Sequence, residues 1–161
     1  MVSTYLSSKK VLDSLLVNSQ FLTLAKKIVN STIGSPAYIL AYNGLDALLS
    51  SLKITYEVNV FKSNGEYSYS NKRTQAETAL AGNHNTRPEV FSAVNYRFGN
   101  PICNKKLYPL DLQSSVCSGY GFAERFDNTY SRVTQYVAMT YTPTSSPLNN
   151  NVFTLRVGQN I

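Results

Sequence analysis

The sequence predicts an α+β domain in which helices pack on a five-stranded antiparallel sheet. Three observations predict this class. Apolar residues recur with helical spacing in the segments 4–30 and 35–52, whereas residues 54–60 alternate between apolar and polar and four later segments are typical of strands. An Asn-Gly pair, the strongest short hairpin signal, joins the first two of these segments. At 161 residues the chain forms a single domain, 1–161, with a sheet core over 53–157.

The first predicted element is one long N-terminal helix within residues 1–30. Its main apolar stripe follows spacings of three, four or seven residues and comprises Tyr5, Leu12, Leu15, Leu16, Leu22, Ala25 and Val29. A second, partial stripe comprises Leu6, Phe21, Leu24 and Ile28. A helix with two apolar faces must bury both. The second face therefore pairs with its copy in a homodimer or extends the core within the monomer.

A second helix is expected to open at Ser35 and Pro36, because serine is a good N-cap and proline suits the first helical position. Alternation over residues 54–60 then predicts a strand, and Asn64-Gly65 predicts a type I′ turn. The paired strand follows over 66–70. Its alternation is expected to place Tyr67 and Tyr69 on one face.

The rest of the chain carries short helices, a long loop and three more strands. One short helix is expected around 75–80, and a second should begin at a Thr86–Glu89 capping box. Residues 97–118 form an inserted loop, which is long for a connection within a domain. The last three strands lie at 120–126, 133–142 and 152–157. The short helices are expected to lie over the sheet.

Cys103 and Cys117 flank the polar part of that loop, and His84 is the single histidine. These residues are too few for a structural zinc site, which needs four close ligands, so no metal is expected. A Cys103–Cys117 disulfide would staple the loop and would imply an oxidising compartment. The alternative is two buried free thiols in a reducing cytosol.

Charge and motifs exclude several functions. The net charge is +6, but the basic residues form isolated pairs, so no nucleic-acid partner is expected. No apolar run reaches about 18 residues, so membrane attachment would require segments that this chain lacks. Motifs for nucleophilic catalysis, zinc hydrolysis and phosphate binding are absent, which predicts a protein that is not an enzyme and uses no cofactor.

The order of elements and three segments resemble the PAS-like extracytoplasmic sensor domains of bacterial sensor histidine kinases, which are related to the Cache (PDC) sensors. The strand–turn–strand of that family corresponds to residues 54–70, and its Asn-His-x-x-Arg-Pro-Glu-Val segment stands at 83–90. Its last two strands correspond to Gly121–Phe126 and to Tyr136-Val137-Ala138. The sequence departs from the family in its longer 97–118 loop and in having Asn64 where Asp is usual.

The resemblance implies a sensor domain outside the cytoplasm, periplasmic or extracellular, either as the ectodomain of a membrane protein or as a secreted relative. In such sensors small ligands, often carboxylates, bind on the open sheet face beneath the short helices. Arginines could hold an anion, tyrosines could wall the pocket and the histidine could add pH dependence. The candidate ligand-binding residues are Arg87, Arg125, Arg132, Tyr67, Tyr69, Tyr120, Tyr136 and His84.

Each candidate also has a purely structural interpretation. Arg87 could pair with Glu89 or Asp127, the other two arginines could be solvated strand ends, and His84 could anchor its loop. The tyrosines could form a half-buried strand face. The alternative function is therefore a free-standing interaction or structural protein, such as a viral or surface protein, with the same fold and no small ligand. A ligand sensor needs converging arginine and tyrosine side chains, whereas an interaction module fills that space with Leu and Phe.

Overall fold

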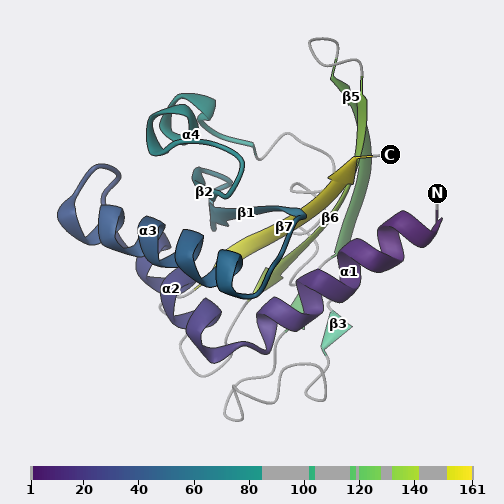
Figure 1. Ribbon diagram of the computed structural model, residues 1–161, viewed down its shortest axis with the longest axis horizontal. Helices are drawn as coiled ribbons and strands as arrows, with labels where there is room; N and C mark the ends of the chain where they lie inside the picture. Colours follow the sequence, from purple (N-terminus) through teal and green to yellow (C-terminus); the bar gives the residue numbers. More distant parts are fainter. Residues whose placement is uncertain are drawn as a thin grey trace.

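The computed structural model describes residues 2–84, 102–103, 117–118, 120–127, 132–141 and 152–160 (Figure 1). Along the chain the elements are α1 (Val2–Leu16), α2 (Ser19–Val29), α3 (Pro36–Ser51), β1 (Glu57–Lys62), β2 (Tyr67–Ser70), α4 (Gln75–Ala81), β3 (Ile102–Cys103), β4 (Cys117–Ser118), β5 (Tyr120–Asp127), β6 (Arg132–Tyr141) and β7 (Phe153–Asn160). The predicted α+β class is confirmed. The predicted Thr86–Glu89 cap and the helix after it lie outside the described residues.

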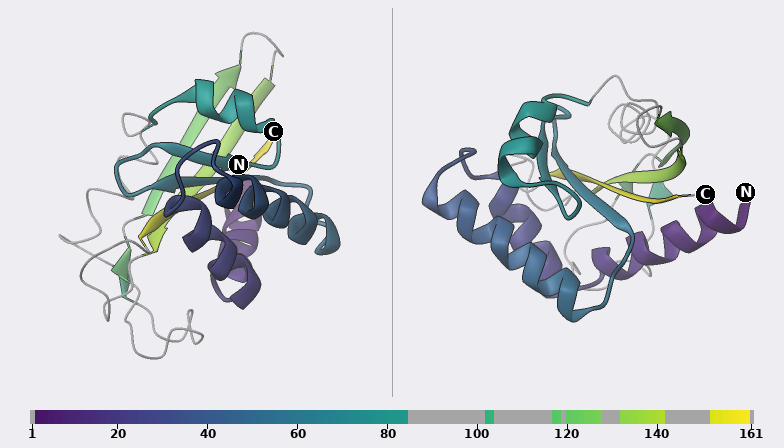
Figure 2. Two further views of the ribbon diagram at one scale, coloured as in Figure 1. Left: turned by 90° about the vertical axis from the view of Figure 1, so that its left-hand side faces the viewer. Right: turned by 45° about the horizontal axis from the view of Figure 1, so that its top comes forward.

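The described strands form one antiparallel sheet of five strands in the order β2-β1-β7-β6-β5, beside a separate two-stranded β3–β4 ribbon. The last strand of the chain, β7, therefore lies at the centre of the sheet, between β1 and β6. Figures 1 and 2 show α1, α2 and α3 packed on one side of this sheet, with α4 beside β2. This arrangement leaves the second face of the sheet for the site described below.

The prediction of one long N-terminal helix is wrong. The structure has two helices, α1 and α2, which are separated by Val17 and Asn18. Asn18 is extended (φ −94°, ψ 115°), and its Oδ1 accepts a 3.0 Å hydrogen bond from the Phe21 backbone N–H. The change of direction lets both apolar stripes reach one core, where Phe21 and Ile28 are fully buried. Phe21 and Ile28 of the second stripe are thus used within the monomer.

The next helix begins as predicted, since Ser35 Oγ accepts a hydrogen bond from the Tyr38 N–H and Pro36 is the first helical residue. The hairpin after β1 is present, but its turn is not the expected type I′. Gly65 alone of its turn residues has a positive φ, of 88°. The Gly65 N–H donates to Lys62 O, and the Lys62 N–H donates to Glu66 O, each at 2.9 Å. These bonds define a three-residue loop that ends in a left-handed glycine.

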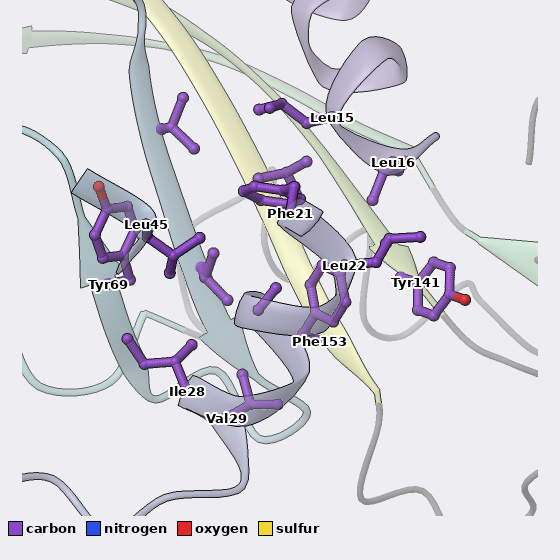
Figure 3. Close-up of a cluster of buried hydrophobic side chains, with 14 of the residues drawn as sticks. Leu15, Leu16, Phe21, Leu22, Ile28, Val29, Leu45, Tyr69, Tyr141 and Phe153 are labelled. Atoms are coloured by element: carbon purple, nitrogen blue, oxygen red, sulfur yellow. The ribbon is translucent and has the colours of Figure 1, made fainter. Parts of the chain in front are cut away.

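The main core lies between the sheet and the first three helices (Figure 3). Phe21 of α2 meets Phe153 of β7 edge to face at 6.5 Å between ring centroids, and Phe153 stacks on Tyr141 of β6 at 5.2 Å. Leu45 of α3 is fully buried in the same cluster. Apolar side chains of three helices thus pack on β7 and β6 from one side. This packing holds β7, the strand that contributes the central residue of the candidate site, in place.

Candidate functional site

A bulge in β2 sends two neighbouring tyrosines to opposite faces of the sheet. Tyr67 pairs with Phe61 and Tyr69 pairs with Val60, so Ser68 is an extra residue in the ladder. Tyr69 therefore joins the core beneath the helices, whereas Tyr67 clusters with Phe61 on the other face. The prediction that both tyrosines share one face is wrong, because alternation holds only where the ladder is regular.

The second face of the sheet carries a buried arginine. Arg156 lies on the central strand β7, opposite Asn59 of β1 and Ala138 of β6 in the ladder. Only 2% of its surface is exposed. Neighbouring residues Leu155 and Val157 point into the helix-side core, so Arg156 projects from the opposite face. A charge this deeply buried must be compensated by its surroundings.

Aromatic rings surround the Arg156 guanidinium. Its Cζ lies 4.4 Å from the ring centroid of Tyr136, 4.9 Å from that of Phe61 and 5.7 Å from that of Tyr67. Each ring face attracts a cation, by roughly 0.5–2 kcal/mol depending on desolvation. The three rings come from β6, β1 and β2, so the sheet itself holds the guanidinium in place.

A chain of polar contacts lies beside these rings. Glu57 Oε2 is 3.8 Å from Arg156 Nη2 and accepts a 2.9 Å hydrogen bond from Asn59 Nδ2. Asn59 Oδ1 in turn accepts a hydrogen bond from the Tyr67 hydroxyl. Burial raises the pKa of Tyr67, and the nearby Arg156 charge opposes part of this rise. At neutral pH Tyr67 is therefore a protonated donor that orients the Asn59 side chain.

His84 completes this group. Its side chain is 8% exposed, and its Nδ1 lies 3.5 Å from Arg156 Nη1. The imidazole packs on the rings of Phe61 and Tyr67, at 5.4 and 4.8 Å between centroids. Its backbone N–H donates to Gly65 O at 2.8 Å, which ties residue 84 to the hairpin. His84 thus anchors its loop and also faces the arginine.

We call Glu57, Asn59, Phe61, Tyr67, His84, Tyr136 and Arg156 the Arg156 cluster. It brings together three of the predicted site residues, namely Tyr67, His84 and Tyr136. Tyr69 lies outside it, on the helix face. The backbones of Tyr120, Arg125 and Arg132 lie in β5 and β6, but their side chains, and all of Arg87, lie outside the described part of the structure.

Sequence reasoning missed Arg156, Glu57, Asn59 and Phe61. A signal for the arginine was present: Phe153, Leu155 and Val157 alternate with polar residues, so Arg156 had to project from the second face of a strand. That face is buried as well, since Thr154 and Arg156 are both shielded from solvent. The last strand, β7, lies between β1 and β6. This long-range pairing cannot be predicted from local sequence patterns.

Within the described part of the chain, no group of three or more His, Cys, Asp and Glu side chains is arranged to hold a metal ion. None of the helices described is long and apolar enough to cross a membrane.

The fold of this chain is similar to that of a solved sensor domain. No family model and no curated protein sequence matches the chain. The structure is similar to the crystal structure of the V. cholerae histidine kinase DctB sensor domain, with a TM-score of 0.56 and 10% sequence identity. The match covers 98% of this chain and 50% of the DctB chain, so this chain spans about half the length of that structure. The likeness concerns the fold alone, and it agrees with the PAS-like layout that the sequence motifs predict.

Proposed function

We propose that the chain is a non-catalytic sensor domain of a signal-transduction protein, located outside the cytoplasm, and that it binds a small anionic ligand at the Arg156 cluster. The observation that carries the proposal is the Arg156 guanidinium, which is 2% exposed and faces three aromatic rings on the sheet face opposite α1–α3. The sensor-domain fold of the structural neighbour supports the same reading.

The chemistry of the cluster suits a carboxylate. A guanidinium offers paired N–H donors that match the two oxygens of a carboxylate, and burial strengthens such a contact. Glu57 Oε2, at 3.8 Å, lies beyond the 2.7–2.9 Å or so of a charge-assisted hydrogen bond, so its attraction to Arg156 is Coulombic alone. The Tyr67 hydroxyl already donates its one proton to Asn59 Oδ1, so the donors for a carboxylate come from Arg156.

The test is a thermal-shift panel of small mono- and dicarboxylates at neutral pH, followed by calorimetry of the compounds that stabilise the domain. Two substitutions should change affinity in opposite directions. R156K keeps the charge but loses the planar pair of donors, and should weaken binding at least tenfold. E57Q keeps the hydrogen bond from Asn59 but removes the competing negative charge, and should strengthen binding several-fold.

K10Q is the matched control, because it removes a charge at an exposed position of α1 and should leave affinity unchanged. Urea unfolding checks that R156K is folded. If R156K does not fold, the predicted gain in affinity of E57Q still tests the proposal. If no carboxylate stabilises the protein, or if E57Q and R156K change affinity in the same direction, the proposal is wrong. The domain would then be an interaction or structural module whose arginine serves packing.

A further inference from the structure

The two-stranded ribbon places the only two cysteines of the chain opposite each other. β3 pairs with β4 antiparallel, with Cys103 opposite Cys117 and Ile102 opposite Ser118. Cα atoms of directly opposed residues in such a pair lie about 4.5–5.5 Å apart. A disulfide requires a Cα separation of about 4.4–6.8 Å. The backbone register therefore meets the main geometric condition for a cross-link.

Register matters because successive side chains on a strand leave opposite faces. A slip of one residue would set a cysteine diagonal to its partner with its Cβ on the other face of the ribbon. With a single histidine in the chain, the two thiols also lack the further ligands that a structural zinc site needs. A cross-link is thus the chemistry that this juxtaposition fits.

We propose that Cys103 and Cys117 form a disulfide that closes residues 104–116 into a loop. The bond forms by thiol–disulfide exchange with an oxidised dithiol donor of the compartment. One thiolate attacks the donor disulfide and forms a mixed disulfide, and the second thiolate then attacks the cysteine sulfur of that mixed disulfide and displaces the donor thiolate. The two cysteines lose two electrons and two protons, and the donor leaves as a reduced dithiol.

The cross-link would act on the sheet as well as on the loop. β4 lies against β6, which is the strand that contributes Tyr136 to the Arg156 cluster. A bridge between the two ribbon strands therefore ties β3 through β4 to β6. It also assigns the domain to an oxidising environment, independently of whether a ligand binds.

The test uses the full chain in a glutathione redox buffer, with intact mass and thiol alkylation read under denaturing conditions. The wild type should be about 2 Da lighter before reduction than after it, and should accept two alkyl groups only after reduction. Reduction should also lower Tm by several degrees, about 4 °C or more. The single variants C103S and C117S should each accept one alkyl group without reductant.

The matched control is the double variant C117S/S118C, which moves one cysteine by a single position along β4. It keeps two thiols in the chain but breaks their register, and should remain reduced at a redox potential that fully oxidises the wild type. If the wild type stays reduced there, or if the shifted variant oxidises equally well, the proposal is overturned. Neither result depends on ligand binding, so this test stands apart from that of the proposed function.

Discussion

Tyr67 and Tyr69 stand two positions apart on β2, yet they make their side-chain hydrogen bonds on opposite faces of the sheet. The Tyr69 hydroxyl donates to Asp46 Oδ1 of α3 at 2.6 Å, whereas the Tyr67 hydroxyl donates to Asn59 Oδ1 within the Arg156 cluster. The bulge at Ser68 separates them. One short strand thus contributes to both the helix-side core and the candidate site.

This relationship gives a matched pair of variants. Y67F leaves the buried Asn59 acceptor without its donor and should destabilise the domain by about 1–3 kcal/mol. It should also change affinity for any carboxylate that binds. Y69F removes a bond to an exposed aspartate and should cost about 1 kcal/mol or less, with affinity unchanged. Urea unfolding and calorimetry measure the two effects, and an altered affinity in Y69F alone would contradict the assignment of faces.

A second prediction concerns Tyr42, which joins three elements. Its hydroxyl lies 2.8 Å from Ser70 O of β2, 2.9 Å from Arg73 O and 2.8 Å from Thr78 Oγ1 of α4. Y42F removes the shared partner of all three groups and should lower the free energy of unfolding by about 2–3 kcal/mol.

Y38F is the control for this prediction, because the Tyr38 hydroxyl makes a single bond, to Ser68 O at 2.8 Å. Its cost should be near 1 kcal/mol. Chemical denaturation of Y42F and Y38F measures both losses of unfolding free energy, and that of Y42F should be the larger. Equal destabilisation would show that the Tyr42 hydroxyl does not tie α4 to β2.

A third prediction concerns the contact between α2 and α3. Gly44 lies inside α3, and a Cβ built on it would meet Leu24 Cδ2 at 2.9 Å. Alanine is favoured over glycine in a helix interior by about 1 kcal/mol, but here Leu24 must turn aside to admit the methyl group. G44A should therefore change stability by only about 0.5 kcal/mol or less in either direction.

In the L24A background the obstacle is gone, and G44A should then stabilise the protein by about 1 kcal/mol. The double-mutant cycle measures this coupling directly. If the glycine substitution has the same effect in both backgrounds, the two helices do not meet at Gly44 as described.

A fourth prediction concerns alkaline pH. Burial is the first cause that raises the pKa of Tyr69 above 10.0, followed by its hydrogen bond to Asp46. Burial likewise raises the pKa of Tyr38. Both remain protonated in the folded state at pH values where the unfolded chain loses these protons. Their stability contribution is fully present below about pH 10 and is lost as the pH rises further.

The free energy of unfolding should therefore fall above about pH 10, by about 1.4 kcal/mol per pH unit for each tyrosine that stays protonated. Urea midpoints between pH 8 and pH 11 measure the slope. Y69F and Y38F should each make this slope shallower by about 1.4 kcal/mol per pH unit, the contribution of one tyrosine proton. A slope that both variants leave unchanged would show that these hydroxyls ionise as freely in the folded state as in the unfolded chain.

The sequence predicts much of this fold because local rules govern its elements. The serine cap at Ser35, the helix after it and the alternating strands follow from capping and periodicity, and the structure places them within a few residues. The sequence does not predict the helix break at Asn18, because the apolar spacing continues across it. Only the burial of both stripes in one core requires the change of direction.

The candidate site was only partly predictable, for a physical reason. Tyr67, Tyr136 and His84 were expected there, and they converge on Arg156. The bulge at Ser68 leaves no mark in the residue pattern, so Tyr69 was misplaced. Arg156 itself becomes central only because β7 inserts between β1 and β6, which is a long-range pairing.

The central claim is that Arg156 holds a small anion, and the most direct measurement observes its side chain. ¹⁵N NMR resolves arginine Nε–H groups, and R156K assigns the Arg156 signal by its loss. On titration with a carboxylate that stabilises the domain, this signal should shift saturably, with the same Kd as calorimetry gives. A carboxylate that binds while the Arg156 signal stays fixed would contradict the account, as would a panel in which none binds.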